Sequence, residues 1–336
     1  MSNIAVSMPA QAAYDYIPPS EEMSSAVSRP APKSTSAVSQ VTLAQSIRCV
    51  GVGLHSGERV CLVLNPAPAG HGIVFRRSDA PHAPLIAARY DNVVDTRLST
   101  VVANPSAPDL RVATIEHLMA ALHANSIDNL LIDVDGPEIP VLDGSAAEFD
   151  FLLQCAGRQI QQAPSQHIEI LRRIRVESEN GAYAELRPAR RGLVLAMSIT
   201  FQSEAIGQQN FAMPLTTDRF RHEVANCRTF VERRDIEMLQ KAGLARGGSL
   251  DNAIVVDGDC ILNRAGLRRP NEFVRHKLLD AVGDLYLAGH RFQAGFMGHK
   301  SGHGLNNRLL HAVFADKANW RLVTETQNPV RLRVAA

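Results

Sequence analysis

The sequence predicts an α+β fold, because strands and helices form separate runs in each half of the chain. In both halves several β-rich stretches come first, a helix follows, and a strand returns after it. This order differs from the strict alternation of strand and helix that a wound parallel sheet requires. With 336 residues, 45% of them hydrophobic and 21% charged, the chain suffices for one large or two ordinary globular domains.

Residues 1–40 are expected to form a disordered leader. The stretch is rich in Ser, Ala and Pro and lacks the periodicity of a strand or a helix. A short helix over Ser20–Val27 is the alternative. Because the stretch has neither a basic start nor a continuous apolar run, a secretory signal is not expected.

Residues 41–163 are predicted to form domain I. Strands are expected at Val41–Cys49, Arg59–Leu64, Gly72–Phe75 and Leu130–Val134. Helical spacing of apolar residues predicts a helix over Arg111–Leu122, and Asp143–Ser145 is expected to cap a second helix at Ala146–Cys155. Gln, Pro and Ser replace the apolar pattern at Gln161–Gln166, which places the domain boundary there.

Residues 164–336 are predicted to form domain II. Its expected strands are Ile168–Glu177, Ala182–Leu186, Leu193–Phe201 and Phe292–Met297. Its expected helices are Thr217–Ala225, Arg234–Ala242, Phe273–Ala288 and Asn306–Asp316. A repeat of domain I is suggested only by the similar order of elements.

Charge and cysteine content exclude several classes of protein. Lys+Arg (35) and Asp+Glu (34) nearly balance, so no global field recruits nucleic acid. The longest apolar runs fall short of the roughly 20 residues that a membrane-spanning helix needs. The five cysteines are scattered without a Cys-x-x-Cys pair, which predicts reduced thiols in the cytoplasm rather than a disulfide framework or a thiolate zinc cage.

The strongest local signal for chemistry is His276 followed by Asp280 and Asp284 in the longest predicted helix. Residues four apart on a helix face the same way, with Cβ atoms roughly 5–6 Å apart. One imidazole and one carboxylate suit a zinc ion, which accepts nitrogen and oxygen ligands. Two ligands do not complete a site, and the alternative is a solvated helix face with an ion pair between His276 and Asp280.

Glu116 and His117 are the second candidate. They resemble half of a zincin motif, but Ala120 and Ala121 stand where its second histidine is required. The alternative is a glutamate on the helix surface beside a partly buried histidine.

Two glycine-rich segments are predicted to be loops. His303 lies between two glycines, so backbone there can approach a ligand closely, and the alternative is a loop histidine whose ring bonds to backbone. Gly243–Ser249 has four glycines or alanines in seven residues but no Walker A or dinucleotide pattern. A flexible surface loop is favoured there over a phosphate cradle.

Taken together and in order, these segments resemble one family, the UDP-3-O-acyl-N-acetylglucosamine deacetylases, zinc amidases of lipid A biosynthesis. The resemblance runs from residue 41 to residue 325. It is carried by Gly51–Gly57 (GVGLHSG), Thr114–Leu118 (TIEHL), Ile127–Asn129 with Glu138–Ser145 (EIPVLDGS), Arg228–Phe230, Arg234–Glu237 (RDIE), Phe273–Asp280 (FVRHKLLD) with Gly283–Asp284, and Lys300–His303 with Leu305–Asn307.

The resemblance implies a catalytic Zn²⁺, one per chain, held by His117, His276 and Asp280. Three protein ligands leave one coordination position for water, as catalytic rather than structural zinc requires. It further implies that the bound metal makes hydroxide available at neutral pH.

The resemblance also implies the acid–base roles. Glu116 is implied as the general base and protonated His303 as the general acid that gives its proton to the leaving amine. Asp284 is implied to orient His303 and to raise its pKa. The Thr229 hydroxyl is implied to stabilise the tetrahedral intermediate, and losing one such donor typically costs about 10²–10³ in rate.

Substrate contacts and fold follow from the same resemblance. Phe230 is implied to pack on the glucosamine ring, and Lys277 and Lys300 to meet the uridine diphosphate. An insert at Val231–Leu262 is implied to form the passage for the 3-O-acyl chain. The implied fold is two similar two-layer α/β sandwich domains with helices packed between outer sheets.

Two departures from the family pattern stand out. Glu232 lies in the acyl passage segment where the family often has an aromatic residue, which bears on acyl preference. Ser99 stands where some members carry a cysteine near the metal, so no thiolate contact is expected.

The resemblance implies hydrolysis of the N-acetyl group of UDP-3-O-[(3R)-3-hydroxyacyl]-N-acetylglucosamine to the free amine and acetate, the committed step of lipid A biosynthesis. The expected protein is a monomer acting on a small molecule. One alternative is a metal amidase for another acylated amino sugar. The other is a non-catalytic nucleotide-sugar or protein-binding module, which the presence of every implied catalytic residue disfavours.

Overall fold

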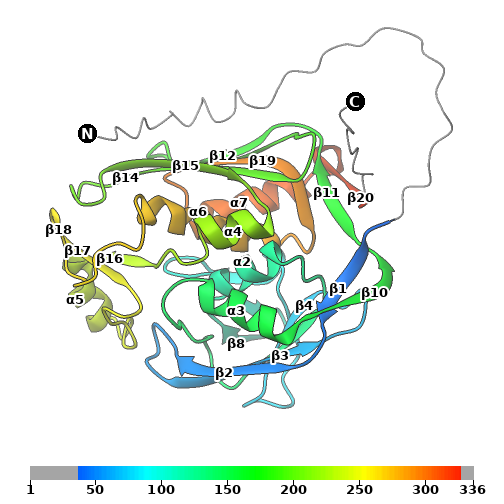
Figure 1. Ribbon diagram of the computed structural model, residues 1–336, viewed down its shortest axis with the longest axis horizontal. Helices are drawn as coiled ribbons and strands as arrows, with labels where there is room; N and C mark the ends of the chain where they lie inside the picture. Colours follow the sequence, from blue (N-terminus) through cyan, green and yellow to red (C-terminus); the bar gives the residue numbers. More distant parts are fainter. Residues whose placement is uncertain (1–36, 327–336) are drawn as a thin grey trace, which may run out of the picture.

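Two outer layers of β-sheet enclose a layer of helices in the computed structural model, which describes residues 37–326 (Figure 1). Mixed sheets and separate helices confirm the α+β class. The predicted leader lies outside the described residues apart from positions 37–40, and Ser39 already begins strand β1. The alternative helix at Ser20–Val27 lies wholly outside them.

The first half of the chain builds one outer sheet in the order β2-β3-β9-β4-β5. Its strands are β2 (Ile47–Val52), β3 (Arg59–Pro66), β9 (Leu130–Val134), β4 (Ile73–Arg77) and β5 (Ile86–Ala87). A second sheet contains β6 (Val93–Asp95), β7 (Val101–Asn104) and β8 (Ala107–Val112) and follows the 3₁₀ turn η1 (Tyr90–Asn92).

The second half builds the opposite outer layer around β19 (Arg291–His299), which pairs with three other strands. The strands of this sheet are β11 (Gln166–Ile170), β12 (Ile174–Glu177), β13 (Tyr183–Arg187), β14 (Leu193–Thr200), β15 (Gln208–Pro214), β19 and β20 (Trp320–Thr324), which follows the turn η2 (Lys317–Asn319).

Two smaller sheets complete the fold. β1 (Ser39–Leu43) pairs with β10 (Arg158–Pro164) beside the junction of the two halves. At one side of the molecule, on the left in Figure 1, β16 (Phe230–Glu232), β17 (Ile254–Asp257) and β18 (Cys260–Ile261) carry helix α5 (Arg233–Lys241). This unit covers the segment 231–262 that the resemblance identifies as the acyl insert.

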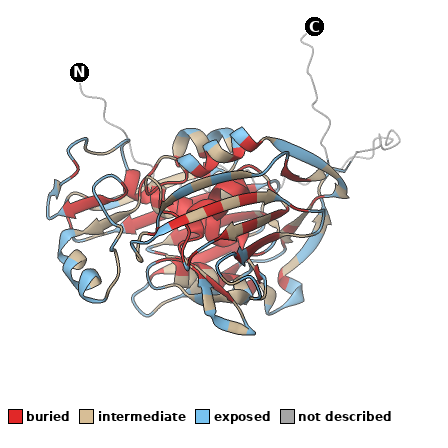
Figure 2. Ribbon diagram, turned by 90° about the horizontal axis from the view of Figure 1, so that it is seen from below, coloured by how far each residue is buried: buried red, intermediate tan, exposed pale blue. Residues whose placement is uncertain are grey.

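The helices between the sheets are α2 (Glu116–Ala124), α3 (Ala147–Ala156), α4 (Thr217–Glu223), α6 (Glu272–Tyr286) and α7 (His303–Phe314). Every residue of α2 is buried, and α6 is buried along nearly its whole length (Figure 2). These two helices pack directly against each other because small residues, Ala120 and Gly283, lie at their contact. Their buried polar residues therefore face each other inside the protein.

Several predicted boundaries were wrong. The single strand predicted at Val41–Cys49 is two strands, β1 and β2, and the one at Ile168–Glu177 is likewise β11 and β12. The helix predicted from Arg111 begins at Glu116, because the preceding residues complete strand β8 and Thr114 adopts a φ of 61°, which helices do not. The segment Gln161–Gln166 contains the end of β10 and the start of β11.

The division into domains at residues 163 and 164 stays a prediction.

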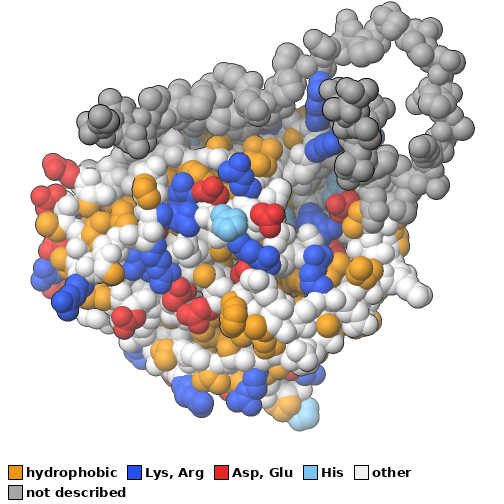
Figure 3. Space-filling model, viewed as in Figure 1, with side chains coloured by type: hydrophobic (Ala, Val, Ile, Leu, Met, Phe, Trp, Pro, Cys, Tyr) orange, Lys and Arg blue, Asp and Glu red, His pale blue; other side chains and the backbone are white. Residues whose placement is uncertain are grey.

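Positive and negative side chains are interspersed on the face seen in Figure 3, in keeping with the formal net charge of +1. None of the helices within residues 37–326 combines the length and the apolar content that crossing a bilayer demands.

Candidate active site

Three metal-ligating side chains from the two halves of the chain converge between α2 and α6. The nitrogen and oxygen atoms of His117, His276 and Asp280 lie within 4.8 Å of one another, and all three residues are buried. Asp280 Oδ1 is 3.5 Å from His117 Nε2 and 3.4 Å from His276 Nε2. A solvated helix face, the alternative for His276 and Asp280, is therefore excluded.

The donor set fits a divalent cation that accepts nitrogen and oxygen. Asp280 Oδ1 is buried and has no hydrogen-bond partner, although an unpaired buried carboxylate oxygen is costly. His276 Nδ1 lies 3.0 Å from the carbonyl oxygen of Cys227, which only accepts, so Nδ1 carries the proton and Nε2 presents its lone pair. Burial lowers the pKa of His276 to about 4, which keeps the ring neutral. These features are those of a metal site.

Lys277 contacts the second oxygen of the Asp280 carboxylate. Its Nζ donates to Asp280 Oδ2 at 2.6 Å. Burial opposes ionisation of Asp280, but His276 and Lys277 outweigh burial and hold its pKa well below the usual range. Asp280 is thus an anion at neutral pH, as a metal ligand must be.

Glu116 is buried at the first turn of α2, so the alternative of a glutamate on the helix surface is wrong. Its Oε2 accepts a hydrogen bond from the backbone N–H of Thr100 at 2.9 Å. Its Oε1 lies 3.8 Å from His303 Nε2. Burial raises the pKa of Glu116, and the nearby histidines His303 and His117 offset this only in part. A carboxylate with a raised pKa is suited to take up a proton.

His303 forms an oriented pair with Asp284. His303 Nδ1 donates to Asp284 Oδ2 at 2.9 Å, and the same oxygen accepts from Asn306 Nδ2 at 2.8 Å. Asp284 Oδ1 accepts from the Thr100 hydroxyl at 2.6 Å. Burial lowers the pKa of His303, but Asp284 and Glu116 outweigh it and raise the pKa to about 9. The imidazole is therefore protonated at neutral pH.

The predicted loop at His303 is wrong. His303 is the first residue of helix α7, and its ring bonds to a carboxylate rather than to backbone. The segment Gly243–Ser249 is irregular, as predicted, but its backbone is anchored: Gly247 N donates to Leu54 O at 3.0 Å.

A largely apolar cavity of about 460 Å³ opens beside the site. Thr229 and Phe230 form part of its wall, and Phe230 packs edge-to-face on Phe273 with ring centroids 5.0 Å apart. Further residues of its wall are Leu54, His55, Leu98, Val231, Ile236, Leu239, Ala253, Val255 and Leu262. Glu232, by contrast, pairs with Arg234 at 2.8 Å.

Lys300 lies near Lys277, at a small cavity that both residues line. The two lysines and Ser301 line a small cavity of about 100 Å³, together with Phe201. Lys300 adopts a φ of 49° and is exposed, whereas Lys277 is mostly buried. The structure thus groups six of the predicted residues in one polar cluster: His117, His276, Asp280, Glu116, Asp284 and His303. Thr229 and Phe230 line the apolar cavity, and Lys277 and Lys300 line the small one.

Three residues of the site were missed by sequence reasoning. Thr100 bonds to both Glu116 and Asp284, and Asn306 bonds to Asp284. His55 lines the apolar cavity, and both of its ring nitrogens are buried without a partner. Asn306 and His55 stand inside motifs that carry the resemblance, and Thr100 directly follows Ser99, so position in these motifs was the available signal.

Comparisons with known proteins identify the family of the chain. The family model described as "UDP-3-O-acyl N-acetylglycosamine deacetylase" matches residues 40–315. A protein of Actinobacillus pleuropneumoniae serotype 3 named UDP-3-O-acyl-N-acetylglucosamine deacetylase is 45% identical over 289 residues, covering 85% of this chain and 94% of its own length. Proteins of the same name from Thioalkalivibrio sulfidiphilus and Haemophilus influenzae are 47% identical over 85% of this chain and 93% of their own lengths. The chain therefore belongs to the UDP-3-O-acyl N-acetylglycosamine deacetylase family.

Proposed function

We propose that this protein is a zinc-dependent deacetylase that hydrolyses the N-acetyl group of UDP-3-O-[(3R)-3-hydroxyacyl]-N-acetylglucosamine, the committed step of lipid A biosynthesis. The names of the relatives, 45–47% identical over 85% of the chain, support the substrate and the reaction. The single observation that carries the chemistry is the unpaired Asp280 Oδ1 between two imidazoles, beside the Glu116–His303 pair.

His117, His276 and Asp280 would hold the metal. Two neutral imidazoles and one carboxylate match the donors that zinc takes in catalytic sites, where one position stays open. When bound, zinc polarises the amide carbonyl and lowers the pKa of water from about 15.7 toward about 7. The raised pKa of Lys277, which Asp280 favours against burial, keeps its ammonium charged beside the ligand carboxylate.

Glu116 acts as the general base. Its Oε2 is fixed by the Thr100 N–H, and its Oε1 points toward the space shared with His303. The attacking water gives one proton to Glu116 while its oxygen bonds to the acetyl carbonyl carbon. The raised pKa of Glu116 makes it a better base than an exposed carboxylate.

His303 acts as the general acid. With a pKa of about 9 it is protonated before reaction, and Asp284 holds Nδ1 so that Nε2 faces the reacting centre. When the C–N bond breaks, the Nε2 proton goes to the amine nitrogen, leaving acetate and free glucosamine amine. The Thr229 hydroxyl, at the edge of the apolar cavity, stabilises the oxyanion that forms in between.

The two cavities are assigned to the two ends of the substrate. The apolar cavity of about 460 Å³ beside Phe230 receives the 3-O-acyl chain, with the glucosamine ring against Phe230 itself. Lys277 and Lys300, which line the small cavity, meet the anionic diphosphate of the UDP group, for which two ammonium groups are suited. The segment 231–262 acts as an insert of the second domain, and the two domains meet at α2 and α6.

The free cysteines support action in a reducing compartment. All five cysteines fall within the described residues and none is paired. Burial raises the pKa of the Cys227 thiol to about 12, which keeps it protonated and unreactive. We assign the protein to the cytoplasm on this basis.

The test uses purified protein and synthetic substrate. We expect about one tightly bound zinc per chain, acetate release that depends on the UDP group, and near-complete loss of turnover in Glu116→Ala and His303→Ala with the fold preserved. Equal turnover of a substrate without UDP would indicate a different acylated amino sugar. Absence of bound metal in the wild type, or wild-type rates in both variants, contradicts the proposal.

A further inference from the structure

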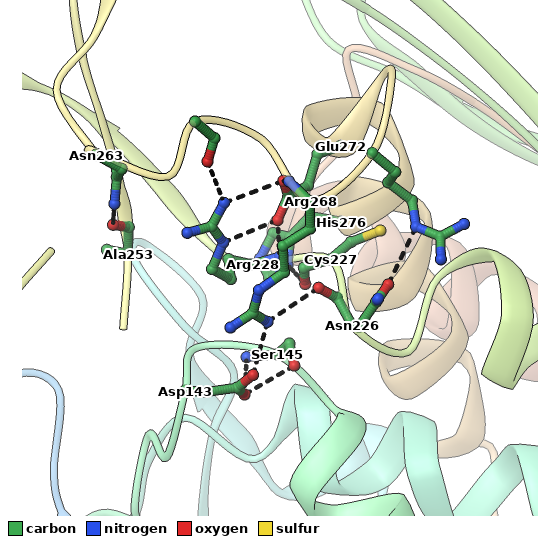
Figure 4. Close-up of polar contacts among 12 residues, drawn as sticks. Asp143, Ser145, Asn226, Cys227, Arg228, Ala253, Asn263, Arg268, Glu272 and His276 are labelled. Carbon is green, nitrogen blue, oxygen red and sulfur yellow. Dashed lines mark hydrogen bonds and ion pairs between the residues drawn. The ribbon is translucent and has the colours of Figure 1, made fainter. Parts of the chain in front are cut away.

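A buried ion pair, Arg228–Glu272, lies close to the candidate ligand His276 (Figure 4). Its side chains are 6% and 0% exposed. Arg228 Nε is 3.0 Å from Glu272 Oε1, and Nη2 is 3.2 Å from Oε2, so the two planar groups meet through parallel hydrogen bonds. Such bidentate pairing fixes both position and angle.

Backbone groups lock this pair further. Glu272 Oε1 also accepts from the backbone N–H of Arg228 at 3.0 Å, and Oε2 accepts from that of Arg268 at 2.6 Å. Arg228 Nη2 donates to the carbonyl oxygen of Gly266 at 2.8 Å. The carboxylate therefore joins two chain segments, each through a main-chain donor.

One of the joined segments carries His276, and the other carries the carbonyl group that accepts its hydrogen bond. Glu272 is the first residue of α6, so it stands one helical turn before His276. Arg228 directly follows Cys227, whose carbonyl oxygen accepts the Nδ1 proton of His276. The ion pair thus sets the distance between the helix that carries the imidazole and the carbonyl that orients it.

We propose that Arg228 and Glu272 are positioning residues for the metal ligand His276. Burying an ion pair seldom adds net stability, because desolvation offsets the attraction. Here the ion pair instead holds the Cys227 carbonyl in place. That carbonyl selects the His276 tautomer whose Nε2 is unprotonated, and it orients the His276 ring toward Asp280. This inference rests on the metal site proposed above.

The same segment also leads into Thr229 and Phe230. Thr229 N donates to the carbonyl oxygen of Gly144 at 2.8 Å, and Thr229 O accepts from Ile254 N at 2.8 Å. These bonds hold Thr229 independently of the ion pair, so loss of the pair is expected to affect metal binding before it affects substrate contacts. Metal affinity is consequently the primary readout, and KM the secondary one.

The experiment compares Arg228→Lys and Glu272→Gln with the wild type. Lysine keeps the positive charge but not the two parallel bonds, and glutamine keeps the shape but not the negative charge. Zinc affinity is measured by competition with a chromophoric chelator, and Co²⁺-loaded protein is examined by visible absorption. We expect zinc binding about 10–100-fold weaker in each variant and an altered Co²⁺ spectrum. At saturating metal, KM stays near the wild-type value.

Glu185→Gln is the matched control. Glu185 is a fully buried carboxylate on β13 in the outer sheet, paired with Arg173 at 2.6 Å and with Arg187. Glu185→Gln removes a buried negative charge, as Glu272→Gln does, but at a position outside α6. We therefore expect a lower free energy of unfolding and wild-type zinc affinity. Should both single variants fold poorly, the double variant Arg228→Gln/Glu272→Gln removes both charges together, and it is expected to show the same weakened metal binding.

The outcomes separate the inference from the proposed function. If Arg228→Lys and Glu272→Gln keep the zinc affinity and the Co²⁺ spectrum of the wild type, the positioning role is wrong. It is also wrong if Glu185→Gln loses as much zinc affinity as these variants. If the wild type binds no zinc, or if His276→Ala binds it as tightly as the wild type, the metal site itself is wrong.

Discussion

Gly283 of α6 lies against the backbone of Glu116 on α2, so closely that a Cβ atom at position 283 would come within 2.0 Å of the Glu116 carbonyl oxygen. This contact sets how near the two helices approach. It places Glu116 and His117, on α2, beside His276, Asp280 and Asp284 on α6. The site can therefore assemble only with glycine at position 283, where no Cβ atom obstructs the approach of α2.

Replacing Gly283 with alanine is expected to separate α2 from α6. Because the obstructing atoms belong to the backbone, a helix must shift, which costs on the order of 1–3 kcal/mol. A displacement near 1 Å lowers turnover about 10²-fold. Denaturant unfolding and steady-state kinetics measure the two effects. Gly136→Ala is the control, since its Cβ would meet Val60 at an ordinary 3.4 Å, and equal effects in both variants would contradict the assignment.

The pH dependence of kcat/KM tests His303 as the proposed general acid. His303 must be protonated to act, and its pKa is raised to about 9, so kcat/KM is expected to fall as pH rises above about 9. Asp284→Asn removes the charge that contributes most to this rise, so the alkaline limb moves to lower pH. The profile is recorded with zinc-saturated protein. An alkaline limb that stays in place in Asp284→Asn is incompatible with the assignment.

Metal removal is expected to lower the melting temperature. A ligand that binds only the folded state stabilises it, by about 2.7 kcal/mol at a concentration 100 times its Kd. Chelator-treated protein should regain stability when zinc is added back, as followed by calorimetry. His117→Ala should show no such response. His123→Ala is the control, because His123 is buried on the same helix and stacks on Tyr286 instead, and it should retain the zinc response.

Narrowing the apolar cavity is expected to change acyl selectivity. Ile236 on α5 forms part of the cavity wall, so Ile236→Trp should lower kcat/KM roughly tenfold for a long-chain substrate and little for a short-chain one. Met238→Trp on the same helix is the control, because Met238 is 63% exposed. The ratio of the two substrates is the measurement. A parallel loss for both chain lengths would show that the cavity serves another purpose.

The sequence allowed the main elements of the site to be predicted, but not their surroundings. The four-residue spacing of His276 and Asp280 correctly indicated a shared helix face, and the resemblance added His117 from the other half. Spacing alone gave the wrong environment for Glu116, because burial depends on α6 packing across it. No local pattern reports such a contact between distant segments.

The contacts of Thr100 and Arg228 could not be predicted for the same reason. Thr100 and Asp284 are 184 residues apart in the sequence, and Arg228 and Glu272 are 44 residues apart. Strand β15 was missed because its central residues are only half-buried and its sequence is largely polar, so no apolar alternation marks it. Strands such as β9, whose residues alternate between buried and half-buried, were predicted at their observed bounds.

The division of the site between α2 and α6 has a consequence for how the polypeptide matures. Neither half of the chain holds all the residues of the proposed site, so a partly folded or truncated product is expected to be inactive. Recovery of acetate release after dilution from denaturant is therefore expected to follow the docking of α2 on α6.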